Sequence, residues 1–293
     1  MDNDKISITS RFEVHHSWWA MRGIGSPEGE WPLEEKLERI AKASYQGILG
    51  RLPAESEASL WRRKLDDLGF RFGIEAFINE RKDIEDYLSR AADFGVDYIN
   101  AQVGSAFVTG GDAIELLNGL VERAAAYRIP LFVETHRGRV TQDLLRTIDY
   151  VRQIVGLKLT IDFSHYVLAG EIFRNVEIVD PYFAPLLERT ASIHGRISNG
   201  QQIQADITEL QEHPMTEHFG RWWRAGMKEW MQRAKPGDFL PFVCELGPPD
   251  YAVVLPDPAS SVRPVELSDR WSSALALKRF AEELWADVEA EHG

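Results

Sequence analysis

A regular alternation of short apolar runs and longer helical segments limits this chain to few folds. The runs are rich in β-branched or aromatic residues, which is typical of strands buried in a parallel sheet. Eight runs fit this description: ISITSRFEV, GILGRL, FRFGIEAFI, YINAQV, LFVET, KLTIDF, ASIHGRI and FLPFVCEL, at 6–14, 47–52, 70–78, 98–103, 131–135, 158–163, 191–197 and 239–246. We predict a strand at each.

The segments between the runs carry apolar residues at spacings of three and four, which predicts helices. The predicted helices span 33–45, 56–68, 84–94, 112–128, 141–154, 182–189, 218–234 and 268–289. The seventh carries an aromatic stripe that we expect to pack in the core or on a partner: Phe219, Trp222, Trp223, Met227 and Trp230. Strand followed by helix, eight times over, predicts a closed (β/α)8 TIM barrel.

A doubly wound open sheet is the competing fold. It would place a glycine-rich phosphate turn after the first strand, but HHSWWAMRG stands there, and no G-x-G-x-x-G or Walker pattern follows. Since α/β barrels of about 250 residues are single domains, we predict one barrel domain over 1–293. An irregular insertion is expected after the seventh strand, at about 197–215.

The composition of the chain disfavours several classes of binding partner. A formal net charge of −13 disfavours nucleic acid, because binding its phosphates needs clustered Lys and Arg. No apolar run approaches the roughly 20 residues of a membrane span, and MDNDKISITS lacks the features of a signal peptide. The single cysteine, Cys244, fits a reducing compartment, so we predict a cytoplasmic protein. Because the charge disfavours nucleic acid, we predict that the substrate is a small molecule.

Polar residues stand at the ends of four consecutive predicted strands. The fifth ends at Glu134, the sixth at Asp162, the seventh carries His194, and the eighth ends at Glu245. The carboxyl ends of barrel strands meet at one mouth, where three carboxylates would repel one another without a cation. We predict one divalent metal ion held by these four residues, with Mn²⁺ the first choice and Co²⁺, Mg²⁺ or Zn²⁺ as alternatives.

This pattern resembles the xylose-isomerase-like TIM-barrel superfamily of sugar phosphate isomerases and epimerases. That group includes ketose 3-epimerases, hydroxypyruvate isomerases, inosose dehydratases and endonuclease IV. Its Glu, Asp, His and Glu ligand set maps onto Glu134, Asp162, His194 and Glu245, and its D-x-x-H onto Asp162 and His165. The stretches VETHRGRVTQDLLRT, IHGRISNGQQIQ and CELGPPDY resemble a branch of sugar isomerase/epimerases whose substrates are not known.

The resemblance implies roles for several of these residues. Glu134 and Glu245 would be the acid/base pair on opposite faces of the substrate carbon next to the carbonyl, and His165 and Arg196 would contact substrate oxygens. His136 is expected either in the pocket or beside a metal ligand. Arg137 and Arg139 are expected in solvent or in salt bridges.

The loop after the first strand supplies further pocket candidates. It contains His15, His16, Trp18 and Trp19, of which we expect His16 and at least one tryptophan to face the substrate. An indole stacks well on the apolar face of a sugar ring. The Tyr251 loop, stiffened by Pro248 and Pro249, is expected to help cover the site.

The leading hypothesis is a metal-dependent isomerase or epimerase that enolises a ketose or keto-sugar. A lyase that expels a β-substituent from the same enolate, of inosose dehydratase or 3-keto-glycoside type, needs almost the same residues. Endonuclease activity is disfavoured because strands two to four end without histidine. A non-catalytic sugar-binding barrel would be expected to have lost a ligand, and all four are present. Homo-oligomers are common in the family that this chain resembles, so the resemblance also implies a homo-oligomer.

Overall fold

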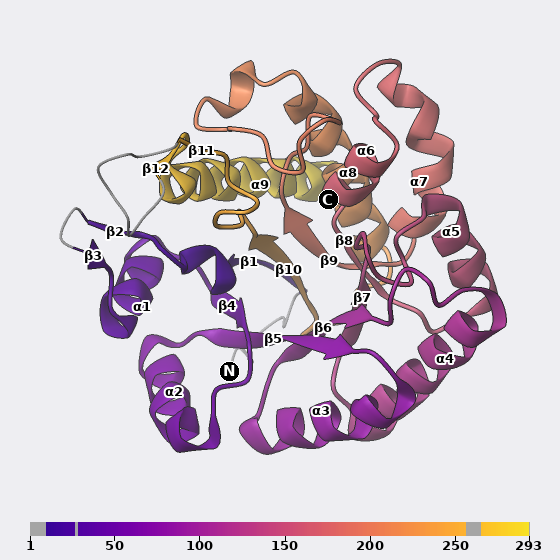
Figure 1. The fold of residues 1–293 in the computed structure, drawn as a ribbon, viewed down its shortest axis with the longest axis horizontal. Coiled ribbons are helices and arrows are strands. Elements are labelled where there is room, and N and C mark those ends of the chain that lie inside the picture. The colour runs from indigo at the N-terminus through magenta and orange to yellow at the C-terminus, as the bar shows by residue number, and fades with distance from the viewer. Residues whose placement is uncertain (1–9, 27–28, 256–264, 293) are drawn as a thin grey trace, which may run out of the picture.

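A closed barrel of parallel strands forms the centre of the molecule (Figure 1). The computed structural model describes residues 10–26, 29–255 and 265–292. The barrel strands are β1 (Arg11–Ser17), β4 (Gly47–Gly50), β5 (Arg71–Ile78), β6 (Tyr98–Val103), β7 (Leu131–Glu134), β8 (Leu159–Ile161), β9 (Thr190–Gly195) and β10 (Phe239–Cys244), and β10 pairs with β1 to close the ring. The predicted (β/α)8 fold is therefore confirmed.

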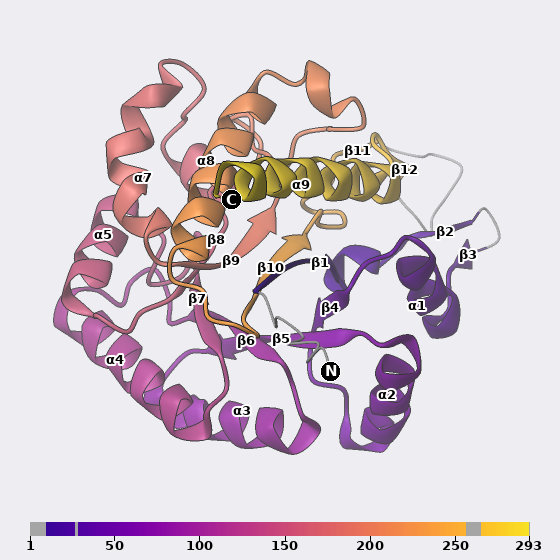
Figure 2. The same ribbon diagram turned by 180° about the vertical axis from the view of Figure 1, so that it is seen from behind.

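Helices surround the barrel on its outer face, as the view from behind also shows (Figure 2). They are α1 (Leu33–Lys42), α2 (Glu55–Leu68), α3 (Arg81–Phe94), α4 (Gly110–Tyr127), α5 (Leu144–Gln153), α6 (Ser164–Ala169), α7 (Asp180–Leu187), α8 (Met215–Met231) and α9 (Arg270–His292). Short 3-10 helices lie at Trp19–Met21, Val176–Val179 and Leu210–Glu212. Two-residue strands form the small pairs β2 (Gly25–Ser26) with β3 (Gly29–Glu30) and β11 (Val254–Leu255) with β12 (Val265–Glu266). No helix in the described ranges is long and apolar enough to cross a membrane.

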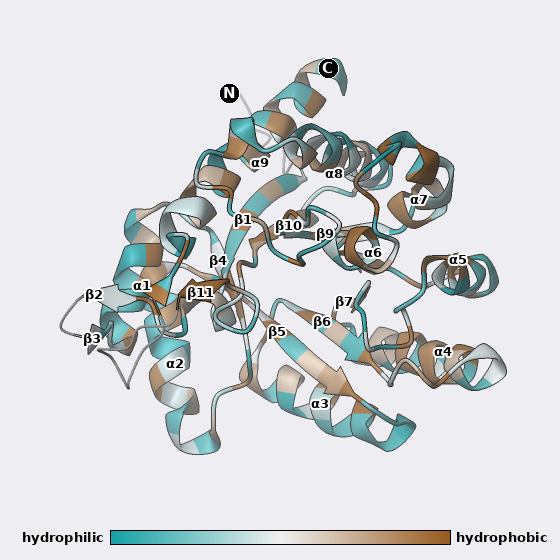
Figure 3. Ribbon diagram, turned by 45° about the horizontal axis from the view of Figure 1, so that its top comes forward, coloured by the Kyte–Doolittle hydropathy of each residue, from teal (hydrophilic) through white to brown (hydrophobic). Residues whose placement is uncertain are grey.

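Two hydrophobic layers hold the barrel together. The larger lies between strands and helices, and the helices carry both hydrophobic and hydrophilic residues along their lengths, as a one-sided burial requires (Figure 3). The smaller fills the inside of the barrel and consists of Leu49, Tyr98, Phe132, Ala191 and Val243. Gly73 makes room for it, since a Cβ there would lie 2.2 Å from the Tyr98 ring.

The observed elements follow the predicted ones closely; apart from the short 3-10 helices and two-residue strands, the main differences concern β1, α5 and α6. β1 continues to Ser17, so His15 and His16 belong to a strand and not to a loop; residues 6–9 of the predicted first strand lie outside the described residues. α5 begins at Leu144, because the Asp143 carboxylate caps it by accepting from the Arg146 amide at 2.9 Å. α6 was not predicted. The stretch 196–214 between β9 and α8 contains one 3-10 helix and no strand.

The aromatic stripe on α8 packs inside this chain. Trp222 and Trp223 are 2% and 1% exposed. Trp222 packs against Phe183 of α7, and Trp223 packs edge to face on Phe242 of β10. The expectation of core packing is confirmed for both, which leaves neither ring available to a partner.

Candidate metal centre and substrate pocket

Strand register decides which polar residues face the barrel interior. His194 of β9 is paired with Val243 of β10, which is paired with His15 of β1. Neighbours in register point to the same side, and side chains alternate along each strand. The interior series on β9 and β10 therefore continues from His194 and Val243 to Arg196 and Glu245, at the carboxyl ends where a barrel places its site.

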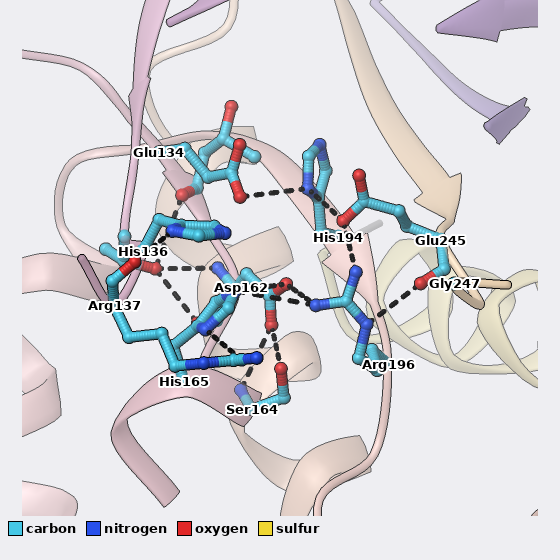
Figure 4. A network of polar contacts seen from close by, with 12 residues as sticks. Glu134, His136, Arg137, Asp162, Ser164, His165, His194, Arg196, Glu245 and Gly247 are labelled. Carbon is cyan, nitrogen blue, oxygen red and sulfur yellow. Dashed lines mark hydrogen bonds and ion pairs between the residues drawn. The ribbon is translucent and has the colours of Figure 1, made fainter. Parts of the chain in front are cut away.

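The predicted metal ligands converge at this end. One ligand atom from each of Glu134, Asp162, His194 and Glu245 lies within 4.8 Å of the others. All four are buried, none more than 3% exposed. His194 lies between the two glutamates, with its Nδ1 at 2.9 Å from Glu245 Oε2 and 3.9 Å from Glu134 Oε1 (Figure 4). The barrel thus brings together residues that are more than 100 positions apart in the sequence.

The two glutamates have opposite electrostatic environments. Burial raises the pKa of Glu134 to about 7, helped by the neighbouring carboxylates of Glu245 and Asp162. Burial would also raise the pKa of Glu245, but the His194 imidazole and the Arg196 guanidinium outweigh it and lower that pKa to about 2. The same carboxylates overcome the burial of His194 and raise its pKa to about 9. Without a further cation, the cluster compensates its negative charge by holding protons.

The donor set fits a divalent metal ion. The Nε2 atom of His194 has no hydrogen-bond partner within the described structure, although the ring is completely buried. Buried polar atoms without partners are rare and call for a ligand. Three carboxylate oxygens with one imidazole nitrogen suit a metal of the Mg²⁺, Mn²⁺, Co²⁺ or Zn²⁺ type. The buried Glu/Asp/His cluster is consistent with divalent metal binding.

Arg196 occupies a place that the sequence did not indicate. Its Nη1 donates to Asp162 Oδ2 at 2.7 Å, its Nη2 donates to Glu245 Oε2 at 2.6 Å, and its Nε donates to the Glu245 carbonyl at 2.9 Å. The guanidinium therefore orients two of the four candidate metal ligands while also lining the pocket. A planar fork with five donors is well matched to such a double contact.

Two amide side chains of β6 position Glu134. Asn100 Nδ2 and Gln102 Nε2 both donate to Glu134 Oε2, at 2.6 and 3.2 Å. They face the interior because β6 alternates Tyr98, Asn100 and Gln102 on one side. Sequence reasoning that looked only at strand ends missed both, although polar residues at every second position of an apolar run were the available signal.

His165 and His136 lie beside the ligands. Their ring centroids are 4.0 Å apart, and His136 lines the pocket. Burial, followed by the charge of Arg196, lowers the pKa of His136 to about 3. His165 is completely buried, with its Nδ1 at 3.0 Å from Arg137 Nη1. The expectation that Arg137 is in solvent or in a salt bridge is wrong: it is half-buried, contacts His165 and lies over the Tyr251 ring at 4.9 Å.

An inner pocket of about 230 Å³ opens directly onto the cluster. Besides Glu134, Glu245, Arg196 and His136, it is lined by Gln102, Phe77, Glu75, Arg51, Trp19 and Tyr251. Trp19 and Tyr251 meet edge to face, with ring centroids 5.0 Å apart. Gly247 allows this closure, since a Cβ there would lie 2.4 Å from Trp19 and 2.7 Å from Tyr251. Arg139, also expected in solvent or a salt bridge, donates instead to Gln102 Oε1 at 3.1 Å.

Three of the predicted substrate contacts do not line the inner pocket: the buried His165, and His16 and Trp18. His16 is one position out of phase with His15, so it faces the helices, where it packs on Tyr45 and on Trp271 of α9. It is not part of the pocket lining because β1 continues through it. Trp18 packs edge to face on Trp61 of α2 and lines an adjoining cavity together with Trp19. Of the tryptophan pair, only Trp19 reaches the inner pocket.

Similarity to solved structures extends over the whole barrel. A xylose isomerase-like TIM barrel protein from Mycobacterium smegmatis in complex with magnesium aligns with a TM-score of 0.60 and 13% identity, over 96% of this chain and 99% of that one. This chain has a xylose isomerase-like TIM-barrel fold. An L-ribulose 3-epimerase aligns with a TM-score of 0.59 and 14% identity, over 97% of each chain. The expected resemblance is thus confirmed for the xylose isomerase-like fold.

A third structure with the same fold is the probable 3-DHS dehydratase AsbF of Bacillus anthracis. It has a TM-score of 0.53 and 17% identity, over 82% of this chain and 95% of that one. No protein-family model and no curated protein matches the sequence. The xylose isomerase-like fold therefore occurs in an epimerase and a probable dehydratase, and the residues of the site must decide between such reactions.

Proposed function

We propose that this protein is a divalent-metal-dependent sugar isomerase or epimerase, which moves a proton at the carbon next to the carbonyl of a ketose or keto-sugar. The observation that carries the proposal is the placement of two buried glutamates, Glu134 and Glu245, on either side of His194 at the wall of one small pocket (Figure 4). A carbon held between two such carboxylates can lose a proton to one and gain a proton from the other.

The chain's own residues then have distinct tasks. Glu134, Asp162, His194 and Glu245 would hold the metal ion, with Mn²⁺ as the first choice. When bound, the ion supplies a Lewis acid for the substrate carbonyl. Asn100 and Gln102 fix the Glu134 carboxylate, and Arg196 fixes that of Glu245. Both proton-transferring groups are thus held at defined positions, as efficient transfer requires.

The remaining lining supplies substrate contacts. Arg196, His136 and Glu75 offer donors and acceptors to sugar hydroxyl groups, and Trp19 offers an apolar ring face. His165 is proposed to act on the substrate through Arg137 and His136, since it is completely buried. Trp19 and Tyr251 restrict the access of water to the pocket, which protects a reactive enolate.

Solvent deuterium exchange tests the proposal. The purified protein is loaded with Mn²⁺, Co²⁺, Mg²⁺ or Zn²⁺ and incubated in D₂O with a panel of ketoses and keto-glycosides, and exchange is followed by NMR. Metal-dependent deuterium incorporation next to the carbonyl is the expected result. Absence of exchange across the whole panel, with metal bound, would contradict it.

A lyase is the second candidate. In that reaction, the enolate left by proton removal expels an oxygen substituent from the β-carbon, and the leaving oxygen takes up a proton. The observation that favours it is the cavity next to the inner pocket, which has room for a departing group. Release of an alcohol or of water, detected beside deuterium exchange in the same samples, separates the two outcomes.

A further inference from the structure

A second cavity adjoins the inner pocket. This outer chamber of about 470 Å³ is bounded by the ends of β1 and β4 and by helices α1 and α2, which neighbour one another in Figure 1. Three residues line both cavities: Trp19, Arg51 and Glu75. Pockets for small ligands usually have about 300–1,000 Å³, so the inner pocket by itself is small for a ligand. The two cavities together form a site of ordinary size.

The junction contains two ionisable side chains that form no hydrogen bond or ion pair with another described residue. The Glu75 carboxyl is only 7% exposed, yet it makes no hydrogen bond or ion pair with another described residue. Arg51 likewise forms no hydrogen bond or ion pair within the described ranges, and its guanidinium lies over the Phe77 ring at 4.9 Å. Buried polar groups are normally paired, so the unpaired Glu75 carboxyl indicates that a ligand completes it, and the exposed Arg51 guanidinium lines both cavities and can bind the same ligand.

The outer chamber has an aromatic corner. Trp18 and Trp61 meet with centroids 4.9 Å apart and an interplanar angle of 84°, so they present two walls at nearly a right angle. Leu52 and Pro53 extend this apolar surface. Indole rings with nearby polar groups suit a ring whose faces are apolar and whose edge carries hydroxyl groups.

The outer chamber has no excess of basic over acidic residues that would select an anionic ligand. Its basic residues, Arg22, Lys36 and Arg51, are matched in number by three acidic residues, Glu30, Glu57 and Glu75. Lys36 is already ion-paired with Glu30. A phosphate group would meet the carboxylates of Glu30 and Glu57, whereas neutral hydroxyl groups can pair with the Glu75 carboxyl and accept from a guanidinium.

We propose that the outer chamber is a subsite for a second ring, so that the substrate is a neutral keto-sugar carrying a sugar or aryl substituent and not a free or phosphorylated monosaccharide. The inference rests on the proposed function and names its substrate class. The reacting sugar lies in the inner pocket, Arg51 and Glu75 bind the groups around the linkage, and the second ring packs in the Trp18–Trp61 corner.

Binding measurements test the subsite without requiring turnover. The probes are methyl glucoside, methyl galactoside and methyl mannoside, each compared with the matching disaccharide and the matching 4-nitrophenyl glycoside. Dissociation constants are measured by calorimetry on the Mn²⁺-loaded protein. For at least one sugar, a two-ring probe should bind about tenfold or more tightly than its methyl glycoside, because the second ring buries apolar surface. Comparing the disaccharides with the 4-nitrophenyl glycosides shows whether the second ring is a sugar or an aryl group.

Variants test whether the Trp18–Trp61 corner causes the tighter binding of two-ring probes. Trp61→Ala should reduce the ratio of the two dissociation constants from about tenfold to about twofold, and Trp61→Phe should retain most of it. Trp31→Ala is the matched control, because Trp31 is also partly buried but packs on Arg39 and Trp271 and lines neither cavity. If Trp61→Ala does not fold, Arg51→Ala, a change on an exposed side chain, should lower the same ratio.

The outcomes separate this inference from the proposed function. Equal binding of one-ring and two-ring probes, or an unchanged ratio in both Trp61→Ala and Arg51→Ala, would overturn the subsite even if monosaccharide ketoses exchange deuterium. A two-ring gain that Trp61→Ala removes would support the subsite even if no sugar in the panel exchanges deuterium. In that case only the proposed isomerase function fails.

Discussion

The two ends of the barrel interior both contain buried charges, but they use them differently. At the amino end, Arg71 bridges Glu13 at 2.8 Å and Asp97 at 3.0 Å. His15 lies between the Tyr98 hydroxyl at 3.1 Å and Glu13 at 3.4 Å. At the carboxyl end, the Nε2 atom of His194 has no hydrogen-bond partner, and Glu75 forms no hydrogen bond or ion pair with another described residue.

The difference distinguishes a structural network from a site. Every charged side chain of the amino-end network has a polar partner, so the network can stabilise the barrel without a ligand. The carboxyl-end cluster instead gathers more carboxylates than its one guanidinium can match. Barrel enzymes place catalysis at the carboxyl end and stability at the other, and the two networks of this chain match the proposed division.

The largest effect on activity should appear when one glutamate at each end of the barrel is replaced by glutamine and the two variants are compared. Glu134→Gln removes the proposed proton-transferring group and proposed metal ligand, so deuterium exchange should fall by about 10²–10⁴-fold and the metal content should drop. Glu13→Gln at the opposite end should leave exchange within about twofold and cost about 1–3 kcal/mol in the free energy of unfolding. Exchange by NMR, metal analysis and denaturant titration measure these effects. An active, metal-loaded Glu134→Gln variant would refute the assigned role.

Replacing the arginine at each end should destabilise the protein in both cases, but added metal should restore stability only at the carboxyl end. Arg196→Met leaves Asp162 and Glu245 without their shared cation, and breaking such a buried pair costs about 3–5 kcal/mol. Added Mn²⁺ should restore part of this loss, because the ion supplies the missing positive charge. Arg71→Met is the control: its side chain is 29% exposed, so the loss should be smaller, and Mn²⁺ should not restore it. Equal metal responses in both variants would contradict the distinction.

Metal binding should stabilise the protein through the carboxyl end alone. At a free concentration of 100 times Kd, an ion that binds only the folded state adds about 2.7 kcal/mol to the free energy of unfolding. Thermal unfolding with Mn²⁺ and with a chelator should show this difference in the unaltered protein. His194→Ala should greatly reduce it, whereas His15→Ala should retain it. Retention of the full shift in His194→Ala would argue against the proposed ligand set.

The sequence predicted the fold because parallel strands buried on both faces are uniformly apolar and each is followed by a helix. The ligand candidates were predictable because Glu134, Asp162 and Glu245 follow the last apolar residues of their strands. Glu75 and Asn100 were missed because they lie inside strands and face inward, where only strand register shows that they meet the cluster. His16 was misplaced for a related reason, since a strand boundary at Val14 concealed the alternation that turns it outward.

The smallest expected effect is on the pH dependence of stability, to which Glu75 and Glu13 should contribute with opposite signs. Burial, reinforced by Glu245 and Glu134, raises the pKa of Glu75 to about 8. The unfolded chain releases that proton near the ordinary value of 4.5, so between about pH 5 and 8 the folded state holds more protons, and its stability falls as the pH rises. In metal-free protein, Glu75→Gln should reduce this fall by on the order of 2 kcal/mol. Part of the fall should remain because Glu134 behaves similarly.

Glu13 provides the control with the opposite sign. Hydrogen bonds from His15 and Arg71 outweigh its burial and lower its pKa, so its contribution is present above the ordinary value and is lost as the pH falls below it. Glu13→Gln should therefore change the stability profile on the acid side and leave the slope between pH 5 and 8 intact. Urea titrations across pH 3–9, with a chelator present, measure both profiles. If Glu75→Gln and the unaltered protein have superimposable profiles above pH 5, Glu75 is ionised in the folded protein and the junction holds a carboxylate.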